Sequence, residues 1–163
     1  MAKQGDAAYA YFLKGYNCSQ SVVAAFAPQL GLSEEMALRM SAGFGAGIGR
    51  MREVCGAFCG VVTVLSLAYA DPADPADKSR MYALVQEAAR LYRARNGGDS
   101  MICRELLAKA GAAPSGGTKA EARTADYYKK RPCPELCRMC ADLCAEFIAA
   151  HPEGRCGVYK EDV

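Results

Sequence analysis

The sequence predicts an all-α protein, a compact multi-helix bundle built around a central apolar helix. Alanine, leucine, methionine, arginine and glutamate recur along the chain, whereas valine, isoleucine and threonine gather in one stretch. Glycine, proline, asparagine and aspartate residues separate the segments that are expected to be helices. No alternating apolar and polar pattern marks a strand, although residues 61–67 are ambiguous. These three observations together favour helices throughout.

The length and composition fit one core. The chain has 163 residues, of which 52% are hydrophobic. We therefore expect a single helical, cysteine-rich domain over residues 1–163, with a short flexible tail from about residue 151.

Local signals define the ends of the helices. Asn17 is expected to cap a helix, with Gln20 at the reciprocal position of a capping box, and Ser33 is expected to cap the next one. Pro134 suits the first turn of the last helix, and Asn96-Gly97-Gly98 is a stop signal. The expected helices cover about 6–14, 18–29, 34 to the glycine run at 41, 54–70, 77–95, 100–110 and 133–150, and a polar run up to about 130 is a weaker helical candidate.

The segment 54–70 contains no charged residue and is almost wholly apolar. Its length lies at the lower limit for crossing a bilayer, and it carries several small and polar residues, so we expect a buried central helix and no membrane insertion. Gly56 and Gly60 form a ridge that would let another helix approach closely. The ridge suits either the core or the interface of a homodimer.

Charge and cysteine content exclude several classes of function. The net charge is +2, and the densest basic cluster, Lys129-Lys130-Arg131, is interpreted as a solvated helix face, so no nucleic-acid binding is expected. No secretory signal is visible at the start of the sequence. Nine cysteines, an odd number, argue against a simple disulfide framework. We therefore expect a cytoplasmic protein with reduced thiols.

Four cysteines fall at or beside the predicted starts of helices: Cys18, Cys55, Cys103 and Cys133. The free N–H groups and the positive end of the helix dipole stabilise anions there, so a lowered thiol pKa is expected. Thiolates are both the nucleophiles of disulfide exchange and the ligands of soft metals. These four residues are the candidate catalytic set.

Further cysteines add candidate metal ligands to these four. Cys133, Cys137, Cys140 and Cys144 form one stripe along the last helix, which is equally typical of a core face. Cys59 shares a helix face with Cys55, whereas Cys156 lies apart. A soft metal ion or an iron–sulfur cluster would have as candidate ligands Cys18, Cys55, Cys59, Cys103, Cys133, Cys137, Cys140 and Cys144. His151 is the only histidine, and we expect it to have a capping or surface role.

The glycine run before Cys55 matches no phosphate-binding fingerprint, because its glycines alternate. We expect it to place backbone N–H groups and a flexible turn against the Cys55 site, and an anion-binding nest is a weaker alternative. The candidate cofactor-binding residues are Gly45, Gly47, Gly49 and Gly56.

The chain resembles the family of redox-active proteins named for the cysteine pattern C-GCAxxG-C-C. The resemblance rests on Gly15-Tyr16-Asn17-Cys18-Ser19-Gln20, Gly43-Phe44-Gly45-Ala46-Gly47-Ile48-Gly49-Arg50, Cys55-Gly56-Ala57-Phe58-Cys59-Gly60, Cys103-Arg104-Glu105-Leu106-Leu107 and the helix start at Cys133. It implies a small prokaryotic cytosolic protein with four signature cysteines and a redox role. Cys137 can replace Cys133 in the correspondence, and five further cysteines depart from the family pattern.

Two functions remain open at this level. The first is thiol–disulfide or electron-transfer chemistry by the four cysteines, which would make the protein a thiol-dependent oxidoreductase. The second is binding of an iron–sulfur cluster or a soft metal by the same thiolates. The redox partner or small-molecule substrate is unknown in either case.

Overall fold

The computed structural model describes residues 3–97, 100–161 and 163, and in this part of the chain helices form with no strand beyond one isolated bridge. The all-α prediction is therefore confirmed. In chain order the elements are α1 (Lys3–Leu13), α2 (Cys18–Ala25), α3 (Glu34–Ser41), the 3₁₀ helix η1 (Ala42–Phe44), α4 (Gly56–Tyr69), α5 (Asp77–Arg95), α6 (Cys103–Lys109), α7 (Ala125–Lys130) and α8 (Cys133–Ala150).

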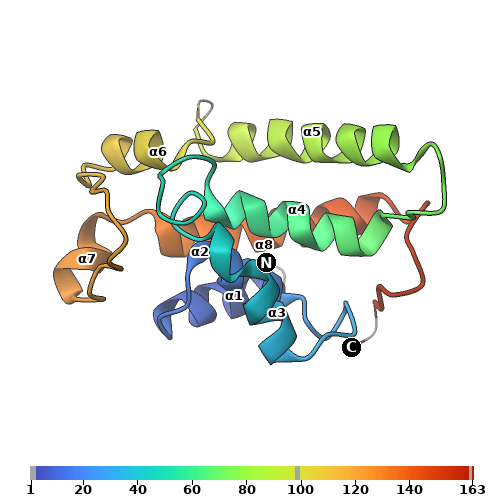
Figure 1. The fold of residues 1–163 in the computed structure, drawn as a ribbon, viewed down its shortest axis with the longest axis horizontal. Helices are drawn as coiled ribbons and strands as arrows, with labels where there is room; N and C mark the ends of the chain where they lie inside the picture. Colours follow the sequence, from blue (N-terminus) through green and yellow to red (C-terminus); the bar gives the residue numbers. More distant parts are fainter. Residues whose placement is uncertain (1–2, 98–99, 162) are drawn as a thin grey trace.

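The helices form three layers (Figure 1). Helices α4 and α8 lie in the middle, α1, α2 and α3 lie on one side, and α5 and α6 lie on the other. Helix α4 packs against α2, α5 and α8, and its side chains Val61, Val64, Leu65 and Ala68 are fully buried. The apolar segment is thus the central helix. Within the described residues, no helix combines the length and apolar character that crossing a membrane requires.

The glycine ridge of α4 faces the protein's own chain. A Cβ atom at Gly60 would lie 2.7 Å from Cβ of Val22, and one at Gly56 would lie 2.9 Å from the carbonyl oxygen of Phe44. Both distances are too short for a side chain. The ridge therefore allows α2 to pack closely on α4, and its two glycines are covered within the chain.

The predicted caps are present. The Asn17 side chain accepts from the N–H of Gln20 at 3.0 Å, and the Gln20 side chain accepts from the N–H of Asn17 at 3.1 Å. Ser33 caps α3 by accepting from the N–H of Met36 at 3.1 Å. Helix α2 ends at Ala25 and not near residue 29, because Pro28 disfavours helical backbone at the residue before it. Gly98 of the predicted stop signal lies outside the described residues.

The C-terminal segment lies along the bundle. The N–H of Cys156 donates to the carbonyl of Ala68 at 2.8 Å, and the N–H of Lys160 donates to that of Gln29 at 2.8 Å. These bonds connect residues after α8 to the end of α4 and to the turn that follows α2. That the chain is one domain with a flexible tail stays a prediction.

Candidate functional site

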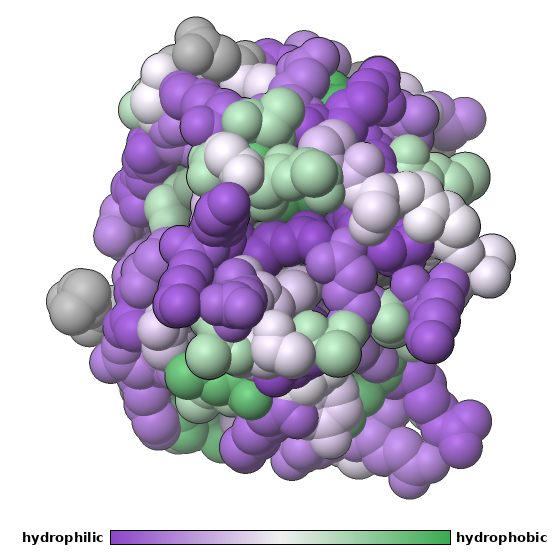
Figure 2. Space-filling view, turned by 90° about the vertical axis from the view of Figure 1, so that its left-hand side faces the viewer, coloured by the Kyte–Doolittle hydropathy of each residue, from purple (hydrophilic) through white to green (hydrophobic). Residues whose placement is uncertain are grey.

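The four cysteines predicted at helix starts occupy those positions. Cys18, Cys103 and Cys133 are the first residues of α2, α6 and α8, and Cys55 directly precedes α4. Figure 1 shows that α4 and α8 begin at the end of the bundle where α6 lies. Figure 2 faces this end and shows hydrophilic side chains around a hollow near the middle of the face.

A short backbone pairing brings Cys55 and Cys103 to the site. Val54 and Ile102 form an isolated antiparallel bridge. The N–H of Cys55 donates to the carbonyl of Met101 at 2.7 Å, and the N–H of Cys103 donates to that of Glu53 at 2.6 Å. This pairing also explains why α6 begins at Cys103 and not near residue 100.

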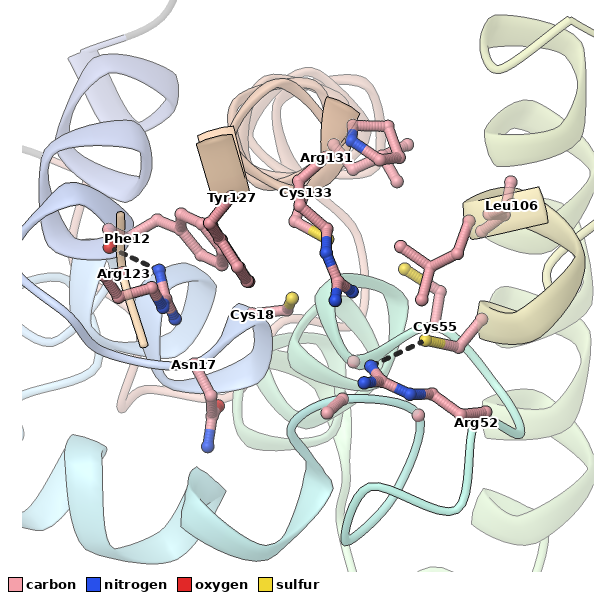
Figure 3. Close-up of a pocket in the computed structure, with 17 residues that line it drawn as sticks. Phe12, Asn17, Cys18, Arg52, Cys55, Leu106, Arg123, Tyr127, Arg131 and Cys133 are labelled. Atoms are coloured by element: carbon pink, nitrogen blue, oxygen red, sulfur yellow. Dashed lines mark hydrogen bonds between the residues drawn. The ribbon is translucent and has the colours of Figure 1, made fainter. Parts of the chain in front are cut away.

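The four cysteines line one cavity of about 60 Å³, which has room for one or two water-sized groups (Figure 3). Cys55 and Cys103 are buried, whereas Cys18 and Cys133 are half-buried. The remaining wall is apolar and basic and consists of Phe12, Asn17, Ala46, Gly47, Arg52, Gly56, Leu106, Leu107, Arg123, Tyr127, Arg131, Pro132 and Leu136.

Cys133 stands at the centre of the thiol contacts. Its thiol and that of Cys18 are hydrogen-bond partners, and its side chain also packs against the small cluster of Cys103 and Leu107. Cys137 lies deeper, with its Sγ 3.7 Å from the carbonyl oxygen of Cys18. Cys133 therefore lines the cavity, whereas Cys137 lies behind it.

The prediction that helix starts lower the thiol pKa is wrong, because burial dominates. Burial raises the pKa of Cys55 to about 11, although the Tyr92 hydroxyl and two backbone N–H groups act to lower it. The hydrogen bond with Cys18, together with burial, raises the pKa of Cys133 well above its ordinary value.

The other two thiols follow the same rule. For Cys18, the hydrogen bond from Cys133 lowers the pKa, but the contact with Cys137 and burial outweigh it and leave the pKa well raised. Burial also raises the pKa of Cys103, and there the Arg52 guanidinium, whose Nη1 lies 3.9 Å from the Cys103 Sγ, opposes the effect. All four groups are therefore neutral thiols at neutral pH, and Cys103 has a positive charge beside it.

The remaining cysteines do not line the cavity. Cys137, Cys140 and Cys144 are fully buried in the main core, as a core stripe requires. Cys59 is half-buried, with its Sγ 3.9 Å from the carbonyl oxygen of Val54. Cys156 donates to the carbonyl of Leu67 at 3.0 Å. Across residues 3–97, 100–161 and 163, no three His, Cys, Asp or Glu side chains are placed so that they could hold a metal ion.

His151 ends α8, where its ring stacks on Phe147, with centroids 4.2 Å apart, and its Nε2 lies 3.5 Å from a carboxylate oxygen of Glu87. It does not line the four-cysteine cavity.

The glycine run forms a left-handed turn. Residues 46–50 all have positive φ angles, from 53° at Ala46 to 72° at Gly47, and Arg52 has a φ of 59°. Glycine adopts such angles readily, whereas the other residues do so at a cost of about 1–2 kcal/mol each. The N–H groups of residues 48–53 all donate to backbone carbonyls of residues 43–48, which leaves them unable to form an anion-binding nest.

The candidate glycines have different positions in this arrangement. Gly47 and Gly56 line the cavity, whereas Gly45 packs on the Asn17 side chain and Gly49 does not line the cavity. A Cβ atom at Gly47 would lie 2.7 Å from Cβ of Cys103 and from Cα of Arg52. The glycine run therefore brings backbone against the thiols and orients Arg52.

A group of arginines beside the cavity is missing from the sequence prediction. Glu121 accepts from Arg52 at 3.0 Å, from Arg50 at 3.2 Å and also from Arg131. Burial alone would raise the pKa of the Glu121 carboxyl, but Arg131, Ser115 and Arg50 together lower it to about 2. The interpretation of Arg131 as part of a solvated face is wrong, because its side chain is only 6% exposed.

Arg123 completes the basic wall. Its guanidinium lies 4.0 Å from the ring centroid of Phe12 and 5.0 Å from that of Tyr127. It donates to the carbonyls of Phe12 and Tyr16 at 3.1 and 3.0 Å. Among the described residues, no carboxylate forms an ion pair with Arg123.

Tyr92 is a second group that sequence reasoning missed. It lies in α5 with no exposed surface, and its hydroxyl faces the Cys55 thiol. Its place in the apolar stripe of α5 could have indicated burial, but nothing in the local sequence pairs it with Cys55.

The fold and the site define a helical, cysteine-rich protein whose thiols meet where several helices begin. The family described as "Putative redox-active protein (C_GCAxxG_C_C)" matches residues 16–147, which include all four cavity cysteines, and the chain belongs to this family. Comparison with curated proteins and with solved structures gave no match.

Proposed function

We propose that the protein carries out reversible thiol–disulfide exchange at the four-cysteine cavity, with Cys133 exchanging partners between Cys103 and Cys18. The observation that carries this proposal is the position of Cys133. Its thiol is a hydrogen-bond partner of Cys18, and its side chain packs against the cluster that contains Cys103.

The first step uses Cys103 because the Arg52 guanidinium beside its sulfur offsets part of the cost that burial places on forming the thiolate. The Cys103 thiolate attacks one sulfur of a substrate disulfide, and the first substrate thiolate leaves and takes up a proton. A mixed disulfide between Cys103 and the substrate results. Cys133, as its thiolate, then attacks the Cys103 sulfur and releases the second substrate thiol.

A last exchange transfers the disulfide inward. Cys18 attacks Cys133 and frees Cys103, so that the final bond joins Cys18 and Cys133. Overall, two protein thiols lose two electrons and two protons, and one substrate disulfide gains them and becomes two thiols. The two bonds that form within the protein join Cys133 to Cys103, against whose cluster it packs, and to Cys18, with whose thiol it interacts.

Cys55 takes no part in this relay. It lies diagonally across the antiparallel bridge from Cys103, a placement that separates Cα atoms by about 7–8 Å. Disulfides rarely join Cα atoms more than about 7 Å apart. We therefore expect Cys55→Ser to retain the disulfides formed by Cys133.

Serine variants test the relay. After oxidation, peptide mapping by mass spectrometry should find the Cys18–Cys133 bond in the wild type and a Cys103–Cys133 bond in Cys18→Ser. In Cys133→Ser a mixed disulfide should accumulate on Cys103. Cys156→Ser is the matched control and should behave like the wild type. A wild type that keeps all its thiols free under an oxidant that converts small dithiols would refute the proposal.

Metal or iron–sulfur binding by these thiolates is the second candidate. The family pattern and the surplus of cysteines support it, whereas the arrangement of the described side chains does not. Anaerobic purification followed by metal analysis and an absorption spectrum separates the two. Stoichiometric metal or thiolate charge-transfer bands would favour this candidate.

A further inference from the structure

A second cavity, of about 100 Å³, lies next to the four-cysteine cavity. The two share lining residues that include Arg52, Arg123 and Arg131, and the second is also lined by Arg50 and Glu121. We call this second space the arginine antechamber. Because the shared residues line both spaces, a group bound in the antechamber lies next to the four-cysteine cavity.

The antechamber holds a surplus of buried positive charge. Four arginines line it against a single carboxylate, Glu121, which three of them share. The side chains of Arg50, Arg52 and Arg131 are only 12%, 10% and 6% exposed. Keeping such charges away from water without enough counter-charge is costly. An anionic ligand would supply the missing charge.

Two of the arginines are held with their charge toward the thiols. Arg123 is fixed by two backbone carbonyls and two aromatic rings, and Arg131 lies over the Tyr127 ring at 4.8 Å. Both lower the pKa of Cys133 through their charge, although other effects outweigh them. In Figure 3 the Arg123, Arg131 and Arg52 side chains surround the space next to Cys18 and Cys133.

We propose that the arginine antechamber binds an acid group of a small disulfide and presents its sulfur atoms to Cys103 and Cys133. The substrate class is then the low-molecular-weight disulfides that carry carboxylates. This inference rests on the proposed thiol–disulfide function and narrows it. The reduction of such a substrate follows the exchange already described and yields two thiols that carry carboxylates.

Three symmetric disulfides of similar size test the charge preference: dithiodiglycolate (anionic), bis(2-hydroxyethyl) disulfide (neutral) and cystamine (cationic). The rate at which each oxidises the reduced protein is divided by its rate with dithiothreitol, which removes differences in intrinsic reactivity. The normalised rate should be at least about 10-fold higher for dithiodiglycolate than for cystamine, and the ratio should fall with added salt.

Variants test which arginines cause the preference for the anionic disulfide. Arg123→Gln and Arg131→Gln should each reduce the ratio about threefold or more, whereas Arg93→Gln, an exposed residue of α5, should leave it unchanged. Because Arg131 also holds Glu121, Arg123→Gln is the safer variant for folding. The wild-type ratio itself requires no variant.

A ligand without sulfur separates the binding of anions from the exchange chemistry. Adipate has the charge and length of dithiodiglycolate but cannot react, and it should bind Cys133→Ser in calorimetry and compete with dithiodiglycolate in the wild type. Equal normalised rates for the three disulfides would overturn the anion preference and leave the exchange function intact. Adipate binding with no protein disulfide from any of the three would instead overturn the exchange function and the substrate class with it.

Discussion

Replacing Glu121 by glutamine tests the charge balance of the site most directly. Its pKa falls from 4.5 to about 2 in the folded protein. A difference of that size corresponds to about 3 kcal/mol of preference for the ionised form. The side chain is 30% exposed, so solvent screening reduces the expected contribution to about 1–2 kcal/mol. Glu121→Gln should therefore lower the free energy of unfolding at pH 7 by at least that amount.

The pH dependence gives the sharper assay. A carboxyl whose pKa is lowered by folding stabilises the protein above its unfolded pKa and loses this contribution as the pH falls through the folded value. In urea titrations the wild type should lose about 1–2 kcal/mol between about pH 5 and pH 2, and the variant should lack this part of the loss. Glu153→Gln, at an exposed position, is the control. Equal acid sensitivity in wild type and Glu121→Gln would refute the reasoning.

Three further predictions concern the thiols and the glycines. Because burial raises the pKa of Cys55, its alkylation by iodoacetamide, followed by mass spectrometry, should keep rising up to about pH 11, and a plateau near pH 8–9 would contradict this. Gly60→Ala should lower the free energy of unfolding by about 1–3 kcal/mol because its methyl group would lie 2.7 Å from a side-chain carbon of α2, whereas Gly43→Ala points into open space and should change it by less than about 0.5 kcal/mol. Ala46→Gly should raise the free energy of unfolding by about 1 kcal/mol because it relieves a positive φ, and Gly47→Ala should lower it by more than about 2 kcal/mol. If Gly47→Ala were the more stable of the two variants, the left-handed turn would be excluded.

Features that depend on neighbouring residues could be predicted from the sequence. The capping box at Asn17 and Gln20, the cap at Ser33 and the start of α8 each depend on a few consecutive residues, and all three are where the sequence places them. The placement of Cys18 and Cys133 at helix starts follows from these boundaries and needs no knowledge of packing. The start of α6 at Cys103 depends in addition on the long-range bridge between Val54 and Ile102.

Features that depend on packing could not be predicted. The thiol pKa values rise because the starts of the helices are buried under other elements, which local sequence does not reveal. The cluster of Arg52, Glu121 and Arg131 brings together two loops far apart in the chain. The handedness of the turn at residues 46–50 was hidden too, since alternating glycines are compatible with many turns.

The positions of Cys18 and Cys133 give the proposed disulfide a mechanical consequence. A bond between them would close a loop on the order of 100 residues, and loop-closure entropy alone predicts a stabilisation of about 4–5 kcal/mol. It would also fasten the first turn of α8 to α2, two helices that pack against each other in the middle and outer layers. The redox state would then determine how firmly the last helix is held to the bundle: oxidation would link α8 covalently to α2, and reduction would leave only the packing between them.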